Sequence, residues 1–328
     1  MRKMREEPRV FTLSLNSSLD HTYYVERIVF EDINRVEEKR VDAGGKGINV
    51  GRMLARLGAE IEVICFLGGE TGEKIASLLK EEGVKFRPIY TKGETRNIFN
   101  FVEKKAGRTL RINEKGPLIS PEEEERLFSC LDELEINSND IFVISGSLPP
   151  GLKVDTYRRI VEKMKSKTPT VVLDTDGEPL KEGVKSLPFM IKPNLWELER
   201  LLGERIENLG KLKERIHLLL NKGISVVSLT IGEKGALVFW NSNILYGAPP
   251  KITPESSIGC GDAFLSGFLF YLLKEEGYRE CLRYAIACGT AKATKKGTLM
   301  PEKNEVDRFV DKVEIYSAIP NFLHLRER

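Results

Sequence analysis

The sequence predicts an α/β fold in which a largely parallel sheet carries helices on both faces. Six apolar, β-rich runs recur along its 328 residues, and segments with helical periodicity lie between most of them. Strands and helices that alternate in this way are typical of parallel sheets. Two further segments, 23–41 and 97–113, alternate like antiparallel strands, the second with a turn at Lys105-Ala106-Gly107. They predict a small accessory sheet.

The predicted elements follow one another along the whole chain. The expected strands are Val10–Leu15, Glu60–Leu67, Ile141–Ser145, Thr170–Asp174, Phe189–Lys192 and Ser225–Leu229. The expected helices are Ile48–Leu57, Ile75–Glu82, Thr156–Met164, Glu197–Leu202 and Leu212–Leu220. A further helix begins at Ser120-Pro121-Glu122-Glu123, with Ser as cap, Pro at the first position and Glu at the third, and runs to about Leu134.

Composition excludes several classes of protein. The 51 basic residues nearly cancel the 49 acidic ones and both are spread along the chain, so no broad surface for nucleic acid is expected. Five cysteines without a CxxC pair, and only three histidines, argue against a disulfide framework or a structural zinc site. The charged N-terminus is not expected to be a signal peptide, and the apolar run Ala263–Leu273 predicts a buried helix too short for a bilayer. We therefore expect a cytoplasmic protein with no membrane contact.

The turn Gly259-Cys260-Gly261-Asp262 opens that apolar helix and is a candidate catalytic site. Small residues there let a phosphate approach the backbone amides at the positive end of a helix. An Asp in the same turn can accept a hydroxyl proton while the amides stabilise charge on a transferring phosphoryl group. The structural alternative is an ordinary glycine turn in which Asp262 only complements the helix dipole.

A second candidate lies where a strand end runs into a helix at Lys192-Pro193-Asn194-Leu195-Trp196-Glu197. Asn194 and Glu197 are three residues apart, so on one helical turn they share a face and could both reach Mg²⁺ or its waters. Lys192 would add positive charge beside phosphates. The alternative is a capping box that serves only the helix.

The third candidate is the glycine-rich loop Gly44–Val50, which opens another helix. Its Asn49 and the nearby Asp20 could bond to sugar hydroxyls, while the glycines let a substrate lie against the backbone. A tight turn from an edge strand to a helix would look similar. Val50 occupies the last glycine position of GxGxxG, and GxxxxGK[ST] occurs nowhere, so a dinucleotide fold and a P-loop lose support.

Arginines form the fourth candidate. Arg96 and Arg111, with Arg35 upstream, could grip the phosphate of an already phosphorylated substrate, because a guanidinium makes two parallel bonds to phosphate. Solvated surface charge is the alternative. The segment from Ser145 to Gly151 follows a buried strand and could add hydroxyl and backbone donors, or be a plain turn.

The combination and order of these motifs resemble the ribokinase-like PfkB family of carbohydrate kinases, from about Val10 to Thr298. The stretches that look like its hexose-phosphate branch are Ser17–Asp20, Gly44–Val50, Phe66–Gly69, Gly93–Asn97, Asn113–Pro117, Ser145–Gly151 and Lys192–Asn194. The resemblance implies a three-layer α/β/α sandwich with a mainly parallel sheet, built as one domain over residues 10–320 after an extension of residues 1–9. It also implies a small β-sheet lid from segments of about 17–41 and 95–114, through which a homodimer forms.

The resemblance implies an ATP-dependent kinase whose acceptor is a hydroxyl of a ketohexose phosphate. Fructose 1-phosphate is the first choice, with tagatose 6-phosphate or fructose 6-phosphate as alternatives. Asp262 would be the base, with Gly259, Cys260 and Gly261 as anion hole. Nucleotide phosphates and Mg²⁺ would meet Lys192, Asn194, Glu197, Thr230, Gly232, Lys234 and Gly235, of which Asn194 and Glu197 would reach Mg²⁺ through water or phosphate. The sugar phosphate would meet Asp20, Gly45, Lys46, Asn49, Arg96, Arg111 and Ser145.

Two other classes of protein are alternatives to the kinase. A catalytically silent sensor of sugar phosphate or nucleotide would be expected to lack a base or metal residue, and none is missing here. A nicotinamide-dependent oxidoreductase lacks its glycine fingerprint. Cys260, where relatives carry Ala or Ser, is small enough to keep the anion hole open and adds a thiol that could be oxidised.

Overall fold

The computed structural model describes residues 7–105, 108–320, 323 and 325, so residues 1–6 of the predicted N-terminal extension lie outside the description. A ten-stranded sheet runs through the molecule. Its strands, in spatial order, are β14 (Glu314–Tyr316), β13 (Asn243–Ala248), β12 (Ala236–Trp240), β11 (Val226–Thr230), β10 (Met190–Ile191), β9 (Thr170–Asp174), β8 (Ile141–Ser145), β1 (Val10–Ser14), β4 (Ile61–Leu67) and β5 (Phe86–Tyr90).

The seven strands from β11 to β5 are parallel, and β12, β13 and β14 continue the sheet antiparallel at one edge. All six predicted strands are present. The Phe189–Lys192 run is paired as a strand only at Met190 and Ile191, because Pro193 follows and has no amide hydrogen for the ladder. Strand β5 and the three antiparallel strands were not predicted.

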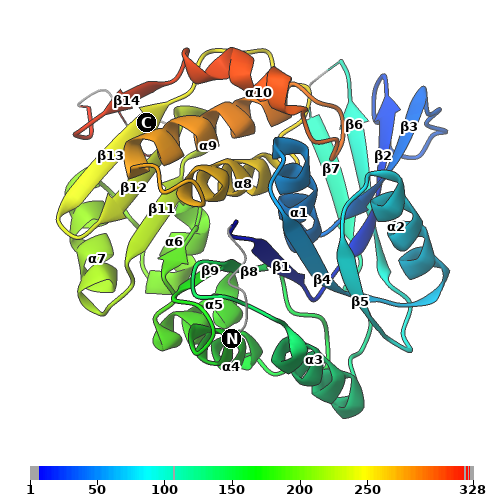
Figure 1. Ribbon diagram of the computed structural model, residues 1–328. Coiled ribbons are helices and arrows are strands. Elements are labelled where there is room, and N and C mark those ends of the chain that lie inside the picture. The colour runs from blue at the N-terminus through cyan, green and yellow to red at the C-terminus, as the bar shows by residue number, and fades with distance from the viewer. Residues whose placement is uncertain (1–6, 106–107, 321–322, 324, 326–328) are drawn as a thin grey trace.

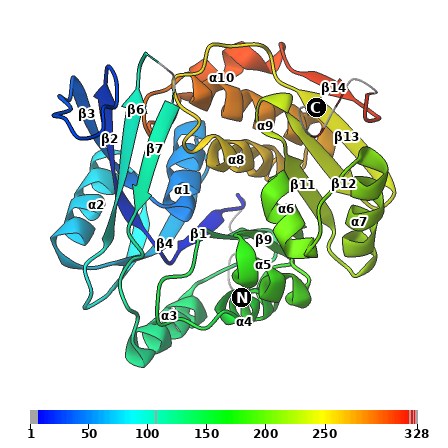
Figure 2. The same ribbon diagram turned by 180° about the vertical axis from the view of Figure 1, so that it is seen from behind.

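Helices cover both faces of the sheet (Figures 1 and 2). One face carries α1 (Lys46–Leu57), α2 (Gly69–Glu81), α8 (Cys260–Leu272), α9 (Tyr278–Ala293) and α10 (Lys303–Val310). The other carries α3 (Pro121–Glu133), α4 (Thr156–Lys165), α5 (Gly177–Gly183), α6 (Leu195–Leu202) and α7 (Leu209–Asn221). Alternate strand residues enter the two cores: Val10 joins one, whereas Phe11 and Leu13 join the other. The predicted three-layer α/β/α sandwich is confirmed.

The accessory sheet is also present and forms a lid of four strands in the order β3-β2-β6-β7, blue and cyan in Figure 1. The strands are β2 (Ser18–Val25), β3 (Glu38–Gly44), β6 (Arg96–Glu103) and β7 (Arg108–Asn113). Each hairpin is antiparallel as predicted, but the central β2–β6 pairing is parallel. Ile28 and Val36 lie in the loop between β2 and β3, so the strand expected over 23–41 is interrupted. The turn expected at Lys105-Ala106-Gly107 includes residues 106 and 107, which lie outside the described residues.

Local sequence explains how the helices that carry the site begin. Gly45 precedes α1 with φ of 104°, a region that favours glycine, and a Cβ on Gly47 would come within 2.5 Å of the Leu13 carbonyl oxygen. The first turn of α1 therefore packs directly on the end of β1. The expected Ser120–Glu123 capping box is present at α3. No helix in the described part of the chain is long and apolar enough to cross a membrane.

Candidate active site

The carboxyl ends of the parallel strands gather polar side chains around one carboxylate, Asp174, at the end of β9. Ser145 at the end of β8 donates its Oγ hydrogen to Asp174 Oδ2 at 3.0 Å. Lys192 Nζ, just beyond β10, lies 3.2 Å from Asp174 Oδ1. Lys46 Nζ, at the start of α1, lies 3.4 Å from Asp174 Oδ1 and 3.4 Å from Glu197 Oε1. Open α/β sheets bind ligands at this edge, so three predicted regions meet where a site is expected.

These charges control one another's protonation. Burial would raise the pKa of Asp174, but Lys192, Lys46 and the Ser145 hydrogen bond lower it below its ordinary value. Burial would lower the pKa of Lys46, but the carboxylates of Asp174, Glu197 and Asp262 raise it. Asp174 is therefore ionised, and Lys46 stays available as a cation for phosphate groups. Sequence reasoning missed Asp174, although an acidic residue at the end of a buried parallel strand was a usable signal.

Asp262 lies in the first turn of α8, where it is buried and 6% exposed. Asn49 Nδ2 of α1 donates to its Oδ2 at 2.8 Å, which joins the glycine-rich loop to the Gly259–Asp262 turn. Burial raises the pKa of Asp262, the nearby Asp174 raises it further, and Lys46 and Asn49 partly offset this. A carboxylate whose pKa is raised toward neutrality is a better proton acceptor than an ordinary one. Asn49 Oδ1 is buried without a hydrogen-bond partner among the described residues.

The backbone before Asp262 has the form expected of an anion hole. Gly259 precedes α8 with φ of 76°, and the helix begins without a side-chain cap, so amides of its first turn are left for another acceptor. The Cys260 thiol donates to the Ser256 carbonyl oxygen at 3.5 Å. Burial raises the pKa of Cys260, so the thiol is protonated at neutral pH and poorly reactive toward oxidants.

On the predicted nucleotide side, the capping box at the start of α6 is present. Asn194 Oδ1 accepts from the Glu197 amide at 2.9 Å, and Glu197 Oε2 accepts from the Asn194 amide at 2.8 Å. Thr230 at the end of β11 lies beside Asn194 through an isolated bridge. The short 3₁₀ turn Gly232–Lys234 and then Gly235, with φ of 92°, follow directly.

The capping-box contacts of Asn194 and Glu197 limit how these two side chains could bind Mg²⁺. Among the described residues no group of three His, Cys, Asp or Glu could hold a metal ion by itself. Asn194 and Glu197 already serve the helix, and the second oxygen of Glu197 faces Lys46. Mg²⁺ usually keeps several waters and binds through phosphates with one or two carboxylates. The pair therefore fits an ion that arrives with the nucleotide and is reached through water.

On the predicted sugar side, Asp20 of β2 is buried against the glycine-rich loop. A Cβ on Gly44 would lie 2.3 Å from Asp20 Cγ, so only glycine fits opposite this carboxyl group. Ser18 Oγ donates to Asp20 Oδ1 at 2.6 Å. Burial raises the pKa of Asp20 to about 6, while the Ser18 bond opposes the rise. Gly45 leaves no room for a side chain beside Ser14 Oγ, 2.9 Å from where its Cβ would lie.

The two predicted arginines do not form one cluster. Arg96 donates to the backbone oxygens of Asn16 at 3.0 Å and Glu114 at 3.2 Å, and lines a hollow of about 550 Å³. Arg111 donates to Ser257 Oγ at 3.2 Å, next to the anion hole. Arg111 pairs with Asn100, four residues along β6 from Arg96, so roughly 13 Å of strand separates the arginines. Arg35 lies in the exposed loop between β2 and β3.

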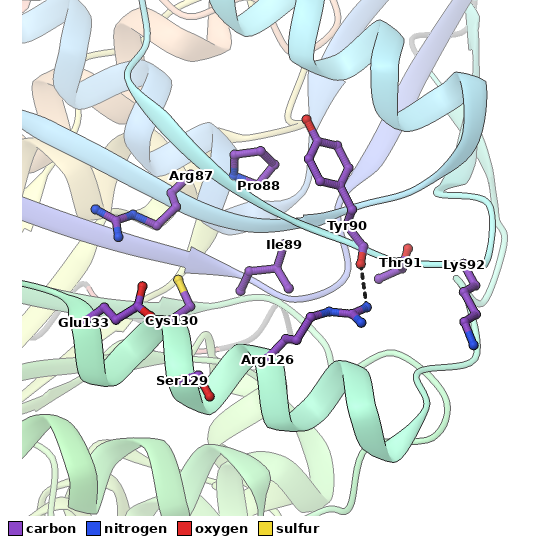
Figure 3. A pocket seen from close by; sticks show the side chains of 10 residues that line it. All are labelled: Arg87, Pro88, Ile89, Tyr90, Thr91, Lys92, Arg126, Ser129, Cys130 and Glu133. Carbon is purple, nitrogen blue, oxygen red and sulfur yellow. Dashed lines mark hydrogen bonds between the residues drawn. The ribbon is translucent and has the colours of Figure 1, made fainter.

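A separate hollow of about 760 Å³ lies between the edge strand β5 and α3, away from these residues (Figure 3). Arg126 of α3 crosses it and donates to the Tyr90 carbonyl oxygen at 2.9 Å. It contains none of the predicted site residues.

Comparisons with known proteins agree with the fold. A family model described as "pfkB family carbohydrate kinase" matches residues 13–304. The chain is 34% identical to a 1-phosphofructokinase of Bacillus subtilis (strain 168) over 284 residues, 87% of this chain and 92% of that protein. Two solved structures of Escherichia coli phosphofructokinase-2 are each 27% identical and cover 93% of this chain and 99% of their own. One is in complex with fructose 6-phosphate (TM-score 0.86), and the other is a tetrameric inhibited form (TM-score 0.85).

Proposed function

The chain belongs to the pfkB family of carbohydrate kinases and is a phosphotransferase with an alcohol group as acceptor, and from that premise we propose that its acceptor is fructose 1-phosphate and its donor ATP. The products would be fructose 1,6-bisphosphate and ADP. The relative at 34% identity is a 1-phosphofructokinase, which supports this acceptor. Fructose 6-phosphate is the second candidate, because the similar E. coli phosphofructokinase-2 has been solved with it.

The observation that carries the proposal is the Asn49–Asp262 contact at the first turn of α8. Asp262 takes the proton of the sugar hydroxyl as that oxygen attacks the γ-phosphorus in line. The bond from the γ-phosphorus to the bridging oxygen breaks, and ADP leaves with the electron pair. The amides of Gly259, Cys260 and Gly261 stabilise the charge on the transferring group. Asn49 orients the base and offers its free Oδ1 to a sugar hydroxyl.

Asp174 holds the ammonium group of Lys192 at this edge of the sheet, where it can attract the nucleotide phosphates. Lys46, held by the same carboxylate, would reach the transferring phosphoryl group from the sugar side. Mg²⁺, when bound with ATP, neutralises charge on the phosphates. Asn194 and Glu197 would contact its water molecules. Thr230 and the turn from Gly232 to Gly235 would line the nucleotide beyond α6.

A phosphorylated acceptor is supported by Arg96. Its Nε is buried and has no hydrogen-bond partner among the described residues, while its other nitrogens hold backbone oxygens. A rigidly held guanidinium with one free donor suits a phosphate group. Arg111, more than ten ångströms away along the lid, would serve the reacting end of the same substrate beside the anion hole.

We test the acceptor by measuring ADP release with fructose 1-phosphate, fructose 6-phosphate, tagatose 6-phosphate and fructose at equal concentrations. The highest kcat/KM is expected for fructose 1-phosphate, and unphosphorylated fructose should be poorest. A preference for fructose 6-phosphate would support the second candidate. Activity on fructose alone would overturn the role of Arg96, and binding of ADP and sugar phosphate without turnover would favour the sensor.

We also propose a homodimer through the lid. In the strand register, Tyr23 of β2 lies beside Phe101 of β6, which lies beside Leu110 of β7, and Phe99 of β6 lies beside Ile112 of β7. We call these five residues the apolar lid face. The opposite face carries Asp20, Asp42 and Arg111, which are polar. Apolar residues gathered on one exposed face of a sheet are typical of a protein interface.

A further inference from the structure

Lys292, near the end of α9, is a charged side chain that the proposed reaction does not use. It is completely buried, and its Nζ donates to the backbone oxygen of Gly297 at 2.9 Å. Burying an ammonium group against a carbonyl oxygen instead of a carboxylate is costly. An apolar side chain of the same length would fill the space at a lower cost in folding free energy. The charge therefore calls for an explanation beyond packing.

The position of Lys292 explains why a charge is buried there. A Cβ placed on Gly259 would lie 3.4 Å from Lys292 Cε, so the lysine packs directly behind the first residue of the proposed anion hole. Burial lowers the pKa of Lys292 to about 8, with the carboxylates of Asp42 and Asp262 opposing the shift and the Arg52 guanidinium adding to it. The ammonium group is thus predominantly charged at neutral pH.

The turn that holds the ammonium group is itself fixed from the lid and from α1. The Gly297 amide donates to the Tyr24 hydroxyl of β2 at 2.8 Å. Arg52 Nη1, also fully buried, donates to the Thr298 carbonyl oxygen at 3.3 Å. Lys292 is therefore held in place, and its charge cannot turn toward solvent without breaking this arrangement.

We propose that Lys292 is a built-in cation that supports the anion hole from behind and stabilises the negative charge that develops on the transferring phosphoryl group. It is a positioning residue, because the Gly259 backbone separates it from the substrate. A fixed charge in a water-excluded site interacts more strongly than the same charge in water. Since the phosphoryl charge shifts toward the anion hole during transfer, the effect should appear in kcat more than in substrate binding.

The test compares Lys292→Met with Lys292→Gln. Methionine keeps the length and removes both charge and hydrogen bond, whereas glutamine can still donate to Gly297 without a charge. We expect kcat to fall roughly 10- to 100-fold in both, with KM for ATP and for the sugar phosphate changed less than about threefold. Melting temperatures should be unchanged or higher, because a buried charge has been removed. Wild-type kcat in either variant would overturn the proposal.

Tyr24→Phe is the control for loop position, because it frees the Gly297 amide and leaves the Lys292 charge in place. Its kcat should stay within about threefold of wild type, and a loss as large as that of Lys292→Met would show that the turn matters and the charge does not. The inference rests on the proposed anion hole, so Asp262→Asn is measured in parallel. If Asp262→Asn turns over normally, the anion hole is misplaced and the proposed site fails. If it is inactive while Lys292→Met is normal, only the role of Lys292 is wrong.

Discussion

At the scale of single residues, Asp262 is a carboxylate whose surroundings favour proton transfer over structural support. It contributes no cap to α8, and the side chain that bonds to it among the described residues is the Asn49 amide, which leaves the charge on the carboxylate. We predict that Asp262→Asn lowers kcat by about 10²- to 10⁴-fold, the usual contribution of a general base. The melting temperature should not fall, because the raised pKa shows that the ionised group is disfavoured by burial.

The measurement is ADP release by the purified variant beside a thermal unfolding curve. Asp132→Asn on α3, which is exposed and on the opposite face of the sheet, is the matched control and should behave as wild type. Near-normal turnover of Asp262→Asn would mean that another group takes the proton.

Asp20 gives a prediction about pH. Its pKa of about 6 in the folded protein lies above the ordinary value of 3.8, so the folded state binds this proton more tightly than the unfolded state. Ionisation of Asp20 therefore costs stability as the pH rises from about 4 to about 6, and the full cost, at most about 3 kcal/mol, applies above that range. Asp20→Asn removes the cost while glycine at position 44 still leaves room for the side chain.

We expect Asp20→Asn to unfold at a higher denaturant concentration than wild type at pH 7.5, with the difference disappearing near pH 4. Its KM for the sugar phosphate should rise, because the amide accepts hydrogen bonds more weakly than a carboxylate. Urea unfolding at several pH values, with KM measured at pH 7.5, checks both. A constant stability difference across this pH range would show that Asp20 does not have the raised pKa.

At the scale of elements, the first turn of α6 caps the helix and also contacts a lysine of the site. Glu197 closes the capping box with Asn194 and also presents its second oxygen to Lys46. The two tasks separate in Glu197→Gln, because the amide oxygen can still accept from the Asn194 backbone while the charge is lost. We predict a small change in melting temperature and a roughly 10-fold rise in the Mg²⁺ concentration needed for half-maximal activity.

The chain offers a matched control for this variant. Glu123 closes an equivalent capping box at the start of α3, away from the site. Glu123→Gln should leave the Mg²⁺ dependence unchanged. If both variants shift it, or neither does, Glu197 acts only as a helix cap.

Sequence reasoning succeeded where the signal is local. The Ser120 cap, the glycine turn before α8 and the apolar parallel strands each carry their pattern within a few residues. Helix α9 was missed because many of its own residues are small and buried, so its sequence does not alternate between an apolar and a polar face. The β12–β13 hairpin was missed although Asn241, with φ of 47°, stands in its tight turn. The contact between Asp174 and Lys46 could not be predicted, because the two residues are 128 positions apart and only the order of the strands brings them together.

At the scale of the whole molecule, the two faces of the lid differ in chemistry. Leu110 and Ile112 lie on the apolar lid face, and Arg111 between them points to the other side, where it reaches Ser257 beside the anion hole. In the chain as described, β7 pairs only with β6, so its outer edge is unsupported. A second copy packed on the apolar lid face would hold β7 and thereby Arg111.

We predict that Ile112→Glu, which places a charge on the apolar lid face, weakens the dimer at least roughly 10-fold, since desolvating that charge costs more than about 1.4 kcal/mol. Ile112 is 51% exposed, and Leu218→Glu on α7, at 47% exposure, introduces the same charge on a surface outside the lid as the control. Sedimentation velocity over a range of concentrations should show dimers for wild type and Leu218→Glu, and monomers for Ile112→Glu.

The monomeric variant should also lose activity, chiefly through a raised KM for the sugar phosphate, because Arg111 is no longer held. A wild-type protein that is monomeric at all concentrations would contradict the dimer, and a fully active monomer would show that the lid positions Arg111 without a partner.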